Sequence, residues 1–372
     1  MNIRHLSLTN FRNYERLEID LPPHLMVLQG DNAQGKTNLL EAIYLLATAK
    51  SHRATAEREL INWATPREEL GIARLLAQVQ IGSGSLRVEI ALIGAYHSPE
   101  EATHVQKRIR INGVPRRAID LVGQVNVVLF SSQDIDLIGG APSLRRRYLD
   151  LTNCQVDSRY VRALQRYNKV LLHRNRLLRL IGERRAEAGE LDFWDRELVE
   201  NGSYLIMKRQ HMVAELDEFA RPIHRQLSSG ESLKIAYLPS VSGDFDQRLK
   251  DVRKREIAQG VTLVGPHRDD LAFLVNDVDM NIYGSRGQQR TIALSSKLAE
   301  ASFMRSKIDD HPILLLDDML SELDAARRHH LLASIGSYQQ VVITTTDLDR
   351  FDPGFLAEAA LFRVSEGRIN PL

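Results

Sequence analysis

The chain begins with an alternation of apolar and polar residues. Apolar side chains occupy every second position around Leu6 and Leu8 and again over residues 17–21, which is typical of strands with one buried face. The continuous apolar run Leu25–Leu28 predicts a buried strand, and it leads directly into a glycine-containing segment. Beyond residue 37, apolar side chains recur at helical spacing. We therefore predict a strand, a loop and a helix in succession.

Short runs with strand character follow, and the pair Asn112-Gly113 is a strong signal for a hairpin turn. The runs cover residues 72–81, 86–93, 108–111 and 125–130. Together they predict a small antiparallel sheet.

The periodicity becomes helical between residues 143 and 228, with a charged turn at 182–189. Residues 233–241 read as a strand, residues 245–259 as a polar helix, and strand signals return at Val261–Val264. The closing part alternates a helix (287–305), the buried strand Ile313–Leu316, a helix (325–335) and the strand Val341–Ile343. This alternation is typical of a parallel sheet covered by helices.

The pattern therefore predicts an α/β protein in which a helical lobe is inserted into a first lobe. The first lobe would have a mixed sheet with covering helices and a small antiparallel β subdomain. We expect its N-terminal part at residues 1–130, the mainly helical second lobe at 131–258, and the return of the chain to the first lobe at 259–372.

Composition adds limits to this picture. The chain has 372 residues, 43% of them hydrophobic, which is enough for cores of ordinary size. It has no apolar run of about 18 residues and no leader-like N-terminus, so we expect a cytoplasmic protein that does not bind membranes. The single cysteine, Cys154, excludes an internal disulfide.

The segment Gly30-Asp31-Asn32-Ala33-Gln34-Gly35-Lys36-Thr37 fits the pattern G-x-x-x-x-G-K-[ST]. In this pattern the glycines let backbone N–H groups surround phosphate, the lysine reaches the outer phosphates and the hydroxyl binds Mg²⁺. The preceding strand and following helix are the context that the motif requires. By itself the motif predicts only a nucleotide.

Two adjacent carboxylates, Asp317 and Asp318, end the apolar strand Ile313–Leu316. Such a pair can place one acid near a magnesium ion and the next beside an attacking water. A strand followed by a polar turn is the alternative. The presence of the phosphate loop in the same chain favours the catalytic interpretation.

A third motif, Ser285-Arg286-Gly287-Gln288-Gln289-Arg290, begins 249 residues after Lys36. The three motifs together resemble the ABC-type ATPase heads of the SMC class, and within that class the bacterial RecF family. The segments Asn10–Tyr14, Gly265–Leu271 and Asp317–Asp324 extend the resemblance over nearly the whole chain.

The resemblance implies a two-lobed head that forms a homodimer over ATP and binds DNA. It further implies action at damaged or gapped replication intermediates, with RecO and RecR as partners, in loading RecA onto single strands and in SOS induction.

The resemblance also assigns roles within the phosphate site. Lys36 and Thr37 would hold the phosphates and Mg²⁺, Asp317 would complete the metal site, and Asp318 would be the general base. Many ABC enzymes have a glutamate in place of Asp318. The shorter aspartate leads us to expect slow, switch-like hydrolysis.

Ser285, Gly287 and Gln288 fall where the ABC signature faces the γ-phosphate bound by the other subunit. A capped helix start is the alternative, and both can hold together. The segment Ser321–Asp324 resembles the loop that contacts the partner's site, although a capping box explains it too.

Gln133 falls where a glutamine reaches magnesium or the attacking water, although a surface glutamine is an equal alternative. Arg12 and Asn13 would reach the nucleotide from the first hairpin, unless Arg12 is a solvated charge. The chain has Thr344–Asp347 where many ABC proteins have a switch histidine. That departure leaves the γ-phosphate sensor unassigned.

Residues 140–185 carry 12 Lys and Arg against 3 Asp and Glu, a net charge of +9 in a chain whose overall net charge is +1. Such density predicts attraction to the phosphate backbone of nucleic acid, without sequence preference. The resemblance implies that the partner is single-stranded or gapped duplex DNA. A solvated face with structural ion pairs is the alternative.

Three other classes share part of this pattern. A transporter subunit, or another ABC-type ATPase that does not act on DNA, would have the ATP chemistry, but a transporter has a shorter interval between the motifs. An SMC tether has arms of hundreds of residues. A small-molecule kinase works without a signature motif from a second subunit. Dimerisation that depends on nucleotide would therefore separate it from the RecF-like alternative.

Overall fold

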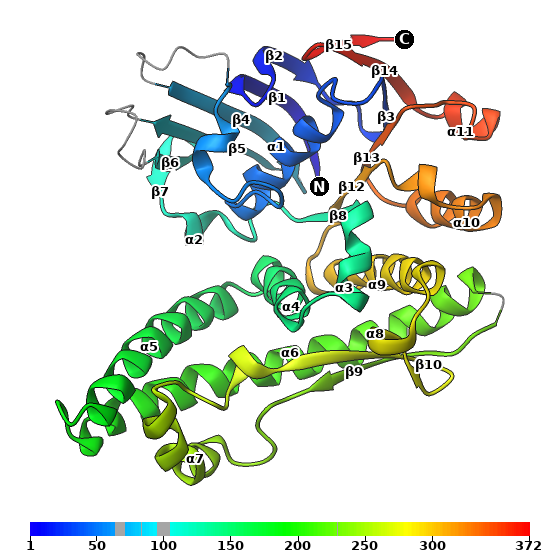
Figure 1. Ribbon diagram of the computed structural model, residues 1–372. Coiled ribbons are helices and arrows are strands. Elements are labelled where there is room, and N and C mark those ends of the chain that lie inside the picture. Colours follow the sequence, from blue (N-terminus) through cyan, green and yellow to red (C-terminus); the bar gives the residue numbers. More distant parts are fainter. Residues whose placement is uncertain (64–70, 83, 95–104, 229) are drawn as a thin grey trace. The chain divides into compact units, whose positions relative to one another are not determined.

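The computed structural model describes residues 1–63, 71–82, 84–94, 105–228 and 230–372 (Figure 1). The chain divides into two compact units. Unit 1 contains Met1–Gln133 and Glu300–Leu372, and unit 2 contains Asp134–Ala299.

Unit 1 contains a six-stranded, mainly parallel sheet in the order β15-β14-β3-β13-β12-β8. Its strands are β3 (His24–Gln29), β8 (Val127–Ser131), β12 (Ile313–Asp317), β13 (Gln340–Thr345), β14 (Ala360–Ser365) and β15 (Arg368–Pro371). Only β15 pairs antiparallel, with β14. The central strands β12 and β13 are almost entirely buried, as their continuous apolar sequences predict.

A second, antiparallel sheet of unit 1 has the order β2-β1-β4-β5-β6-β7. Its strands are β1 (Asn2–Phe11), β2 (Tyr14–Asp20), β4 (Gly71–Ile81), β5 (Gly84–Gly94), β6 (Val105–Ile111) and β7 (Val114–Arg116). The predicted hairpin is confirmed: Asn112 and Gly113, both at positive φ, join β6 to β7, and Ile111 pairs with Val114.

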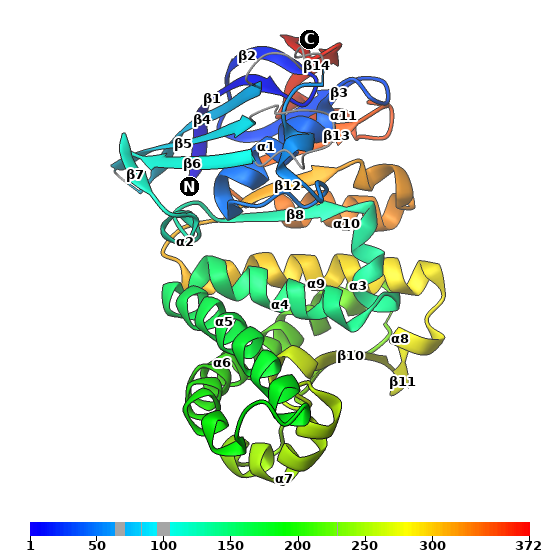
Figure 2. The same ribbon diagram turned by 60° about the vertical axis from the view of Figure 1, so that its left-hand side comes forward.

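Helix α1 (Lys36–Thr48) lies between the two sheets of unit 1 (Figure 2). Apolar residues of α1, of the antiparallel sheet and of the parallel sheet form one core cluster. The shorter helices of the unit are η1 (Glu57–Leu60), α2 (Ala118–Leu121), η5 (Met319–Glu322), α10 (Ala325–Ile335) and α11 (Pro353–Ala357), and η2 (Ser132–Ile135) begins in this unit and ends in the other. The fold of unit 1 therefore confirms the predicted mixed architecture with an antiparallel subdomain. One assignment within it is wrong: the run at residues 125–130 forms β8, which pairs parallel with β12 at the edge of the parallel sheet rather than joining the antiparallel one.

Unit 2 is mainly helical and is built on the antiparallel pair α5 and α6. Its helices are α3 (Asp136–Gly139), α4 (Pro142–Val156), α5 (Ser158–Gly182), η3 (Ala188–Glu190), α6 (Leu191–Leu227), α7 (Phe245–Gln259), η4 (Pro266–Arg268), α8 (Met280–Tyr283) and most of α9 (Arg286–Lys307). Asp157 begins α5 by accepting the backbone N–H groups of Arg159 and Tyr160. A three-stranded sheet of β9 (Leu233–Leu238), β10 (Asp270–Val275) and β11 (Val278–Asp279) packs on α6.

The structure differs from the sequence in where the second lobe ends. The sequence pattern returns the chain to the first lobe at residue 259, whereas residues 259–299 belong to unit 2. The reason is that β10 pairs with β9, from Asp270 opposite Leu238 to Val275 opposite Leu233. Strand periodicity does not reveal which strand will be the partner.

The strand expected at Val261–Val264 is also absent from this described part of the chain. Side-chain oxygens accept hydrogen bonds from the backbone N–H groups that would otherwise pair with a neighbouring strand. The Asn175 carboxamide oxygen accepts the N–H of Thr262 at 2.8 Å, and a carboxylate oxygen of Glu256 accepts the N–H of Leu263 at 2.8 Å. The segment thus satisfies its hydrogen bonds without a sheet.

A buried charge cluster joins the helices of unit 2. The fully buried Arg174 donates to Asp195 at 2.6 Å, to Glu256 at 2.6 Å and to the Thr262 hydroxyl at 2.8 Å. Arg253 adds a second cation against Asp195 at 2.6 Å. These groups link α5, α6, α7 and the segment after α7, so the loss of one partner would leave a buried charge uncompensated.

We predict that Glu256→Ala lowers the free energy of unfolding of unit 2 by about 3–5 kcal/mol, because Arg174 would lose a buried carboxylate. Urea denaturation of the full chain measures this change. The control is Lys250→Ala on the same helix, which breaks an exposed pair with Asp246 and should leave the free energy of unfolding nearly unchanged. Equal stability of the two variants would contradict the structural role of the cluster.

Candidate functional site

The phosphate loop lies in unit 1 between the end of β3 and the start of α1, as predicted from the sequence. Two of its glycines have no room for a side chain. A Cβ at Gly30 would lie 2.3 Å from the Val364 carbonyl oxygen, and a Cβ at Gly35, whose φ is +119°, would lie 2.7 Å from the Asn13 amide nitrogen. The loop backbone is therefore held closely on both sides.

The Lys36 side chain folds into this loop. Its ammonium group donates to the carbonyl oxygens of Gly30 at 2.5 Å and Asp31 at 2.8 Å, and the residue is buried. Burial lowers the pKa of Lys36, while the nearby carboxylates of Asp318, Asp317 and Asp31 act in the opposite direction. A desolvated cation is thus placed among the loop's backbone groups.

The structure brings Thr37 and Asp317 together, although they are 280 residues apart in the sequence. The Thr37 hydroxyl donates to the Asp317 carboxylate at 2.8 Å, and the Thr344 hydroxyl donates to the same oxygen at 3.0 Å. A carboxylate and a hydroxyl are the hard oxygen ligands that Mg²⁺ prefers. The described residues contain no group of three or more acidic, histidine or cysteine side chains that could hold a metal. Mg²⁺ is usually bound by one or two carboxylates together with phosphate.

Asp318 has the features of a carboxylate that is ready to accept a proton. Its backbone is in the left-handed region, with φ at +50°, and its N–H donates to the Thr344 hydroxyl at 2.9 Å. Its Oδ1 atom is buried and has no hydrogen-bond partner among the described residues. Burial raises the pKa of Asp318 above its ordinary value, and Lys36 partly opposes this rise. A carboxylate that is raised in basicity and incompletely paired is suited to proton transfer.

Thr344 is a site residue that sequence reasoning did not assign. It stands at the end of β13, which pairs parallel with β12, so that Asp317 lies opposite Thr344. Its hydroxyl contacts both acidic residues of the site. The only signal in the sequence is a polar residue at the carboxyl end of a buried strand.

Asn13 and Arg12 lie at the turn between β1 and β2. Asn13 supports the loop directly, because its amide donates to the Gln34 carbonyl oxygen at 2.9 Å. The Arg12 guanidinium instead donates to both carboxylate oxygens of Glu41, at 2.9 and 2.8 Å, and to the Glu59 carbonyl oxygen. Contact of either residue with a nucleotide stays a prediction.

Gln133 follows the edge strand β8 and lies in η2, with its side chain exposed. Ser131 at the end of β8 pairs with Asp317, so Gln133 comes two residues beyond the edge at which the acids stand. Its contact with magnesium or water stays a prediction.

The signature-like segment belongs to unit 2, where it begins α9. Ser285 and Gln288 form a reciprocal cap: the Ser285 hydroxyl accepts the Gln288 N–H at 3.3 Å, and the Gln288 side chain accepts the Ser285 N–H at 3.1 Å. Ser285 and Gly287 are exposed, and a Cβ at Gly287 would meet no atom within 4 Å. The capping interpretation is confirmed. Because the start of the helix is also exposed, contact of this segment with the γ-phosphate of a second subunit stays a prediction.

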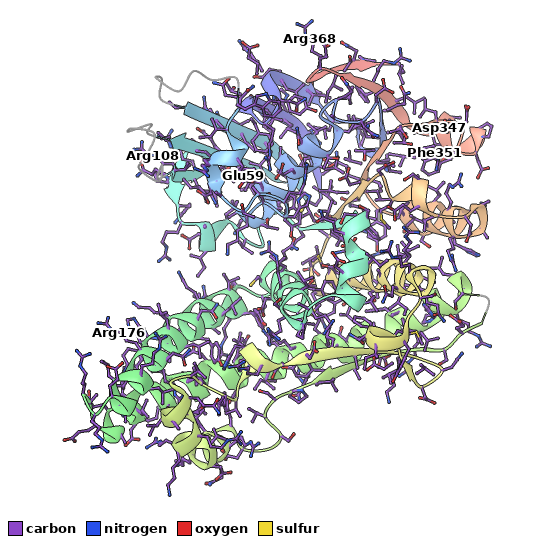
Figure 3. The ribbon with its side chains drawn as sticks, viewed as in Figure 1. Glu59, Arg108, Arg176, Asp347, Phe351 and Arg368 are labelled. Atoms are coloured by element: carbon purple, nitrogen blue, oxygen red, sulfur yellow. The ribbon has the colours of Figure 1, made fainter. Side chains whose placement is uncertain are left out.

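The basic stretch does not form one external surface. Arg145 is buried against Asp270, to which it donates at 2.5 and 2.9 Å, and Arg174 belongs to the buried charge cluster. The interpretation of these two arginines as DNA contacts is therefore wrong, because both are structural. Exposed cations remain, among them Arg162 and Arg176, which is labelled in Figure 3.

The comparisons with known proteins agree with this geometry. A family model described as RecF/RecN/SMC N terminal domain matches residues 2–360. Solved Smc head domains share the fold: one bound to the C-winged helix domain of ScpA has a TM-score of 0.57 at 16% identity. The phosphate loop, the acidic strand end and the inserted helical unit therefore define an ABC-type ATPase head of the SMC class.

Within this class the chain belongs to the RecF family. The DNA replication and repair protein RecF of Herpetosiphon aurantiacus is 45% identical, and that of Roseiflexus castenholzii 46%; in both cases all of both chains is covered. A solved structure of the recombination mediator protein RecF-ATP in the RecFOR pathway has a TM-score of 0.87 at 29% identity, covering 100% of this chain and 97% of the other. None of the described helices combines the length and the apolar character that crossing a membrane requires.

Proposed function

We propose that this chain is an ATP-dependent DNA-binding switch of recombinational repair and replication-gap processing. ATP with Mg²⁺ closes a homodimer on DNA, and slow, DNA-stimulated hydrolysis reopens it. The observation that carries this proposal is the hydrogen bond between Thr37 and Asp317 beside the buried Lys36, since it joins the phosphate loop to the acidic strand end. The ATP-bound RecF structure, 29% identical over the full length, supports it.

Each residue of the phosphate site has a role in this proposal. Lys36 exchanges its two carbonyl acceptors for phosphate oxygens, and Thr37 and Asp317 hold Mg²⁺. The metal, when bound, neutralises charge on the phosphates. Asp318 accepts the proton of the attacking water, and Thr344 keeps both acids in position.

Dimerisation uses the exposed start of α9. Ser285, Gly287 and Gln288 present a hydroxyl, backbone donors and a positive helix end to the γ-phosphate held by a second copy. Ile282 and Tyr283, exposed by 70% and 73%, lie directly before this segment and supply apolar surface for the contact. Nucleotide thereby links the two copies.

In this proposal, exposed cations of the protein contact the phosphate backbone of DNA, so binding shows no sequence preference. Membership of the RecF family supports a cytoplasmic role with RecO and RecR in RecA loading and in SOS induction. The rival function, an ABC-type ATPase that does not act on DNA, predicts the same ATP chemistry without a response to DNA.

We predict that ATP and Mg²⁺ convert the full-length protein from monomer to dimer, and that gapped duplex DNA stabilises the dimer. Sedimentation velocity with ATP, ADP or no nucleotide measures this. Lys36→Ala should remove the shift by abolishing binding, and Ser285→Arg should remove it while leaving ATP bound to the monomer. Asp318→Asn should bind ATP and remain dimeric for longer than wild type, because loss of the general base strongly slows hydrolysis without abolishing it.

A monomer that binds ATP but stays monomeric with and without DNA would contradict the switch. A dimer that forms with ATP but does not bind gapped DNA would favour the rival function. Binding to DNA whose affinity does not fall as salt rises would contradict contact through exposed cations.

Hydrolysis should also depend on pH through Asp318, whose pKa is raised above the ordinary value of 3.8. Because a general base must be deprotonated, kcat should fall on acidification through this raised pKa, at a higher pH than for an ordinary aspartate. Steady-state hydrolysis at saturating ATP and Mg²⁺, measured as a function of pH, gives the profile. Asp318→Asn supplies the baseline, since it keeps the titration of ATP itself and lacks the base. A wild-type profile parallel to that of Asp318→Asn would contradict this role.

A further inference from the structure

Glu41 is a buried carboxylate on α1, one helical turn after Thr37, and its side chain is completely inaccessible to solvent. A carboxylate removed from water is costly unless it is paired and hydrogen-bonded. Arg12 pairs with it through two hydrogen bonds, one to each carboxylate oxygen. Burial acts to raise the pKa of Glu41, but the hydrogen bonds from Arg12 and Ser51 lower it below its ordinary value. Glu41 is therefore charged and held from two sides.

The second side is the segment that follows α1. The Ser51 hydroxyl donates to Glu41 at 2.5 Å and accepts the backbone N–H groups of Arg53 at 2.9 Å and Ala54 at 2.8 Å. The Arg53 guanidinium lies 3.9 Å from Glu41. Glu41 thus holds the turn at Ser51 and lies beside the Arg53 side chain.

Asn38 closes these contacts into a ring at the phosphate loop. Its carboxamide oxygen accepts from Arg53 at 3.1 Å, and its amide donates to the Asn13 carboxamide oxygen at 2.8 Å. Asn13 in turn donates to the Gln34 carbonyl oxygen. The ring runs from the loop through Asn13 and its neighbour Arg12 to Glu41, and returns through Ser51, Arg53 and Asn38.

Arg12 fastens this ring to a further segment. Its N–H donates to the Leu60 carbonyl oxygen at 2.9 Å, and its guanidinium donates to the Glu59 carbonyl oxygen at 2.8 Å. Arg12 has a positive φ of +53°, which is unusual for a residue with a long side chain. The side-chain contacts with Glu41 and Glu59 hold this turn in place.

We propose that Glu41 is a positioning residue of the nucleotide site: through Arg12 it keeps Asn13 against the phosphate loop, and through Ser51 it keeps Arg53 against Asn38, which lies in the first turn of α1 just after the loop. This inference rests on the proposed binding of ATP by the loop. Glu41 itself does not touch the nucleotide. Its negative charge sets where the two flanking cations stand, and Asn13 and Asn38 transmit that placement to the loop backbone.

The test is isothermal titration of full-length Glu41→Gln with ATP and Mg²⁺. Gln keeps the size of the side chain and one acceptor but removes the charge, so the ring loosens while α1 stays packed. We expect a dissociation constant about tenfold higher than that of wild type, in the range found for residues that orient direct ligands, with an unchanged number of sites. If Glu41 only stabilised the fold, the number of sites and the melting temperature would fall and the dissociation constant would not change. That result would overturn the proposal.

The matched control is Asp120→Asn, which removes another carboxylate from an arginine pair of unit 1. Asp120 accepts from the Arg117 guanidinium at 3.3 and 3.4 Å at an exposed site on α2. Its dissociation constant should equal that of wild type. An equal loss in Asp120→Asn would mean that charge alone, and not the ring, affects binding.

A double-variant cycle tests the route through Arg12. If Glu41 acts through Arg12, Glu41→Gln combined with Arg12→Gln should bind no more weakly than the weaker single variant. Losses that multiply would overturn the route. Failure of wild type to bind ATP would instead refute the proposed function, so the two outcomes are distinguishable.

Discussion

Burial of α1 between two sheets is the constraint on which the rest of unit 1 depends. Of the 13 residues of α1, 11 are buried, so this helix has almost no solvent-facing side. A helix that is enclosed on all sides can carry a charge only where a partner meets it. Lys36 meets the carbonyl groups of the loop, and Glu41 meets Arg12 and Ser51. The two buried charges of α1 are therefore both directed to the surroundings of the phosphate loop.

The parallel sheet supplies the second half of the site. Strands β3, β13, β12 and β8 are neighbours and run in the same direction, so their carboxyl ends meet at one edge. The phosphate loop, Thr344, Asp317 and the segment that contains Gln133 follow these ends. Residues that are hundreds of positions apart in the sequence thus come together through strand order alone. The chemistry of the site then depends on short side chains at fixed strand ends.

The sequence was sufficient where the signal was local. The loop motif, the apolar strand before Asp317 and the hairpin at Asn112-Gly113 each lie within about ten residues, and all three elements are present. Ion pairs and strand pairs between residues that are distant in the sequence could not be predicted from local patterns. Arg145 and Arg174 were counted as external charge because their acidic partners are not adjacent in the sequence: Asp270 is 125 residues from Arg145, and Asp195 and Glu256 are 21 and 82 residues from Arg174. For the same reason the sequence pattern assigned residues 259–299 to the first lobe, whereas they belong to unit 2, because β10 pairs with β9.

The central claim is that Thr37, Asp317 and the Ser285 segment of a second copy hold one ATP between them. The most direct measurement is a structure of the full-length chain with a slowly hydrolysed ATP analogue and Mg²⁺. The account predicts Mg²⁺ coordinated by the Thr37 hydroxyl and associated with Asp317, and the Ser285 hydroxyl of a second copy within hydrogen-bond distance of the γ-phosphate. A nucleotide bound away from the Thr37–Asp317 pair, or a γ-phosphate that no second copy contacts, would contradict it.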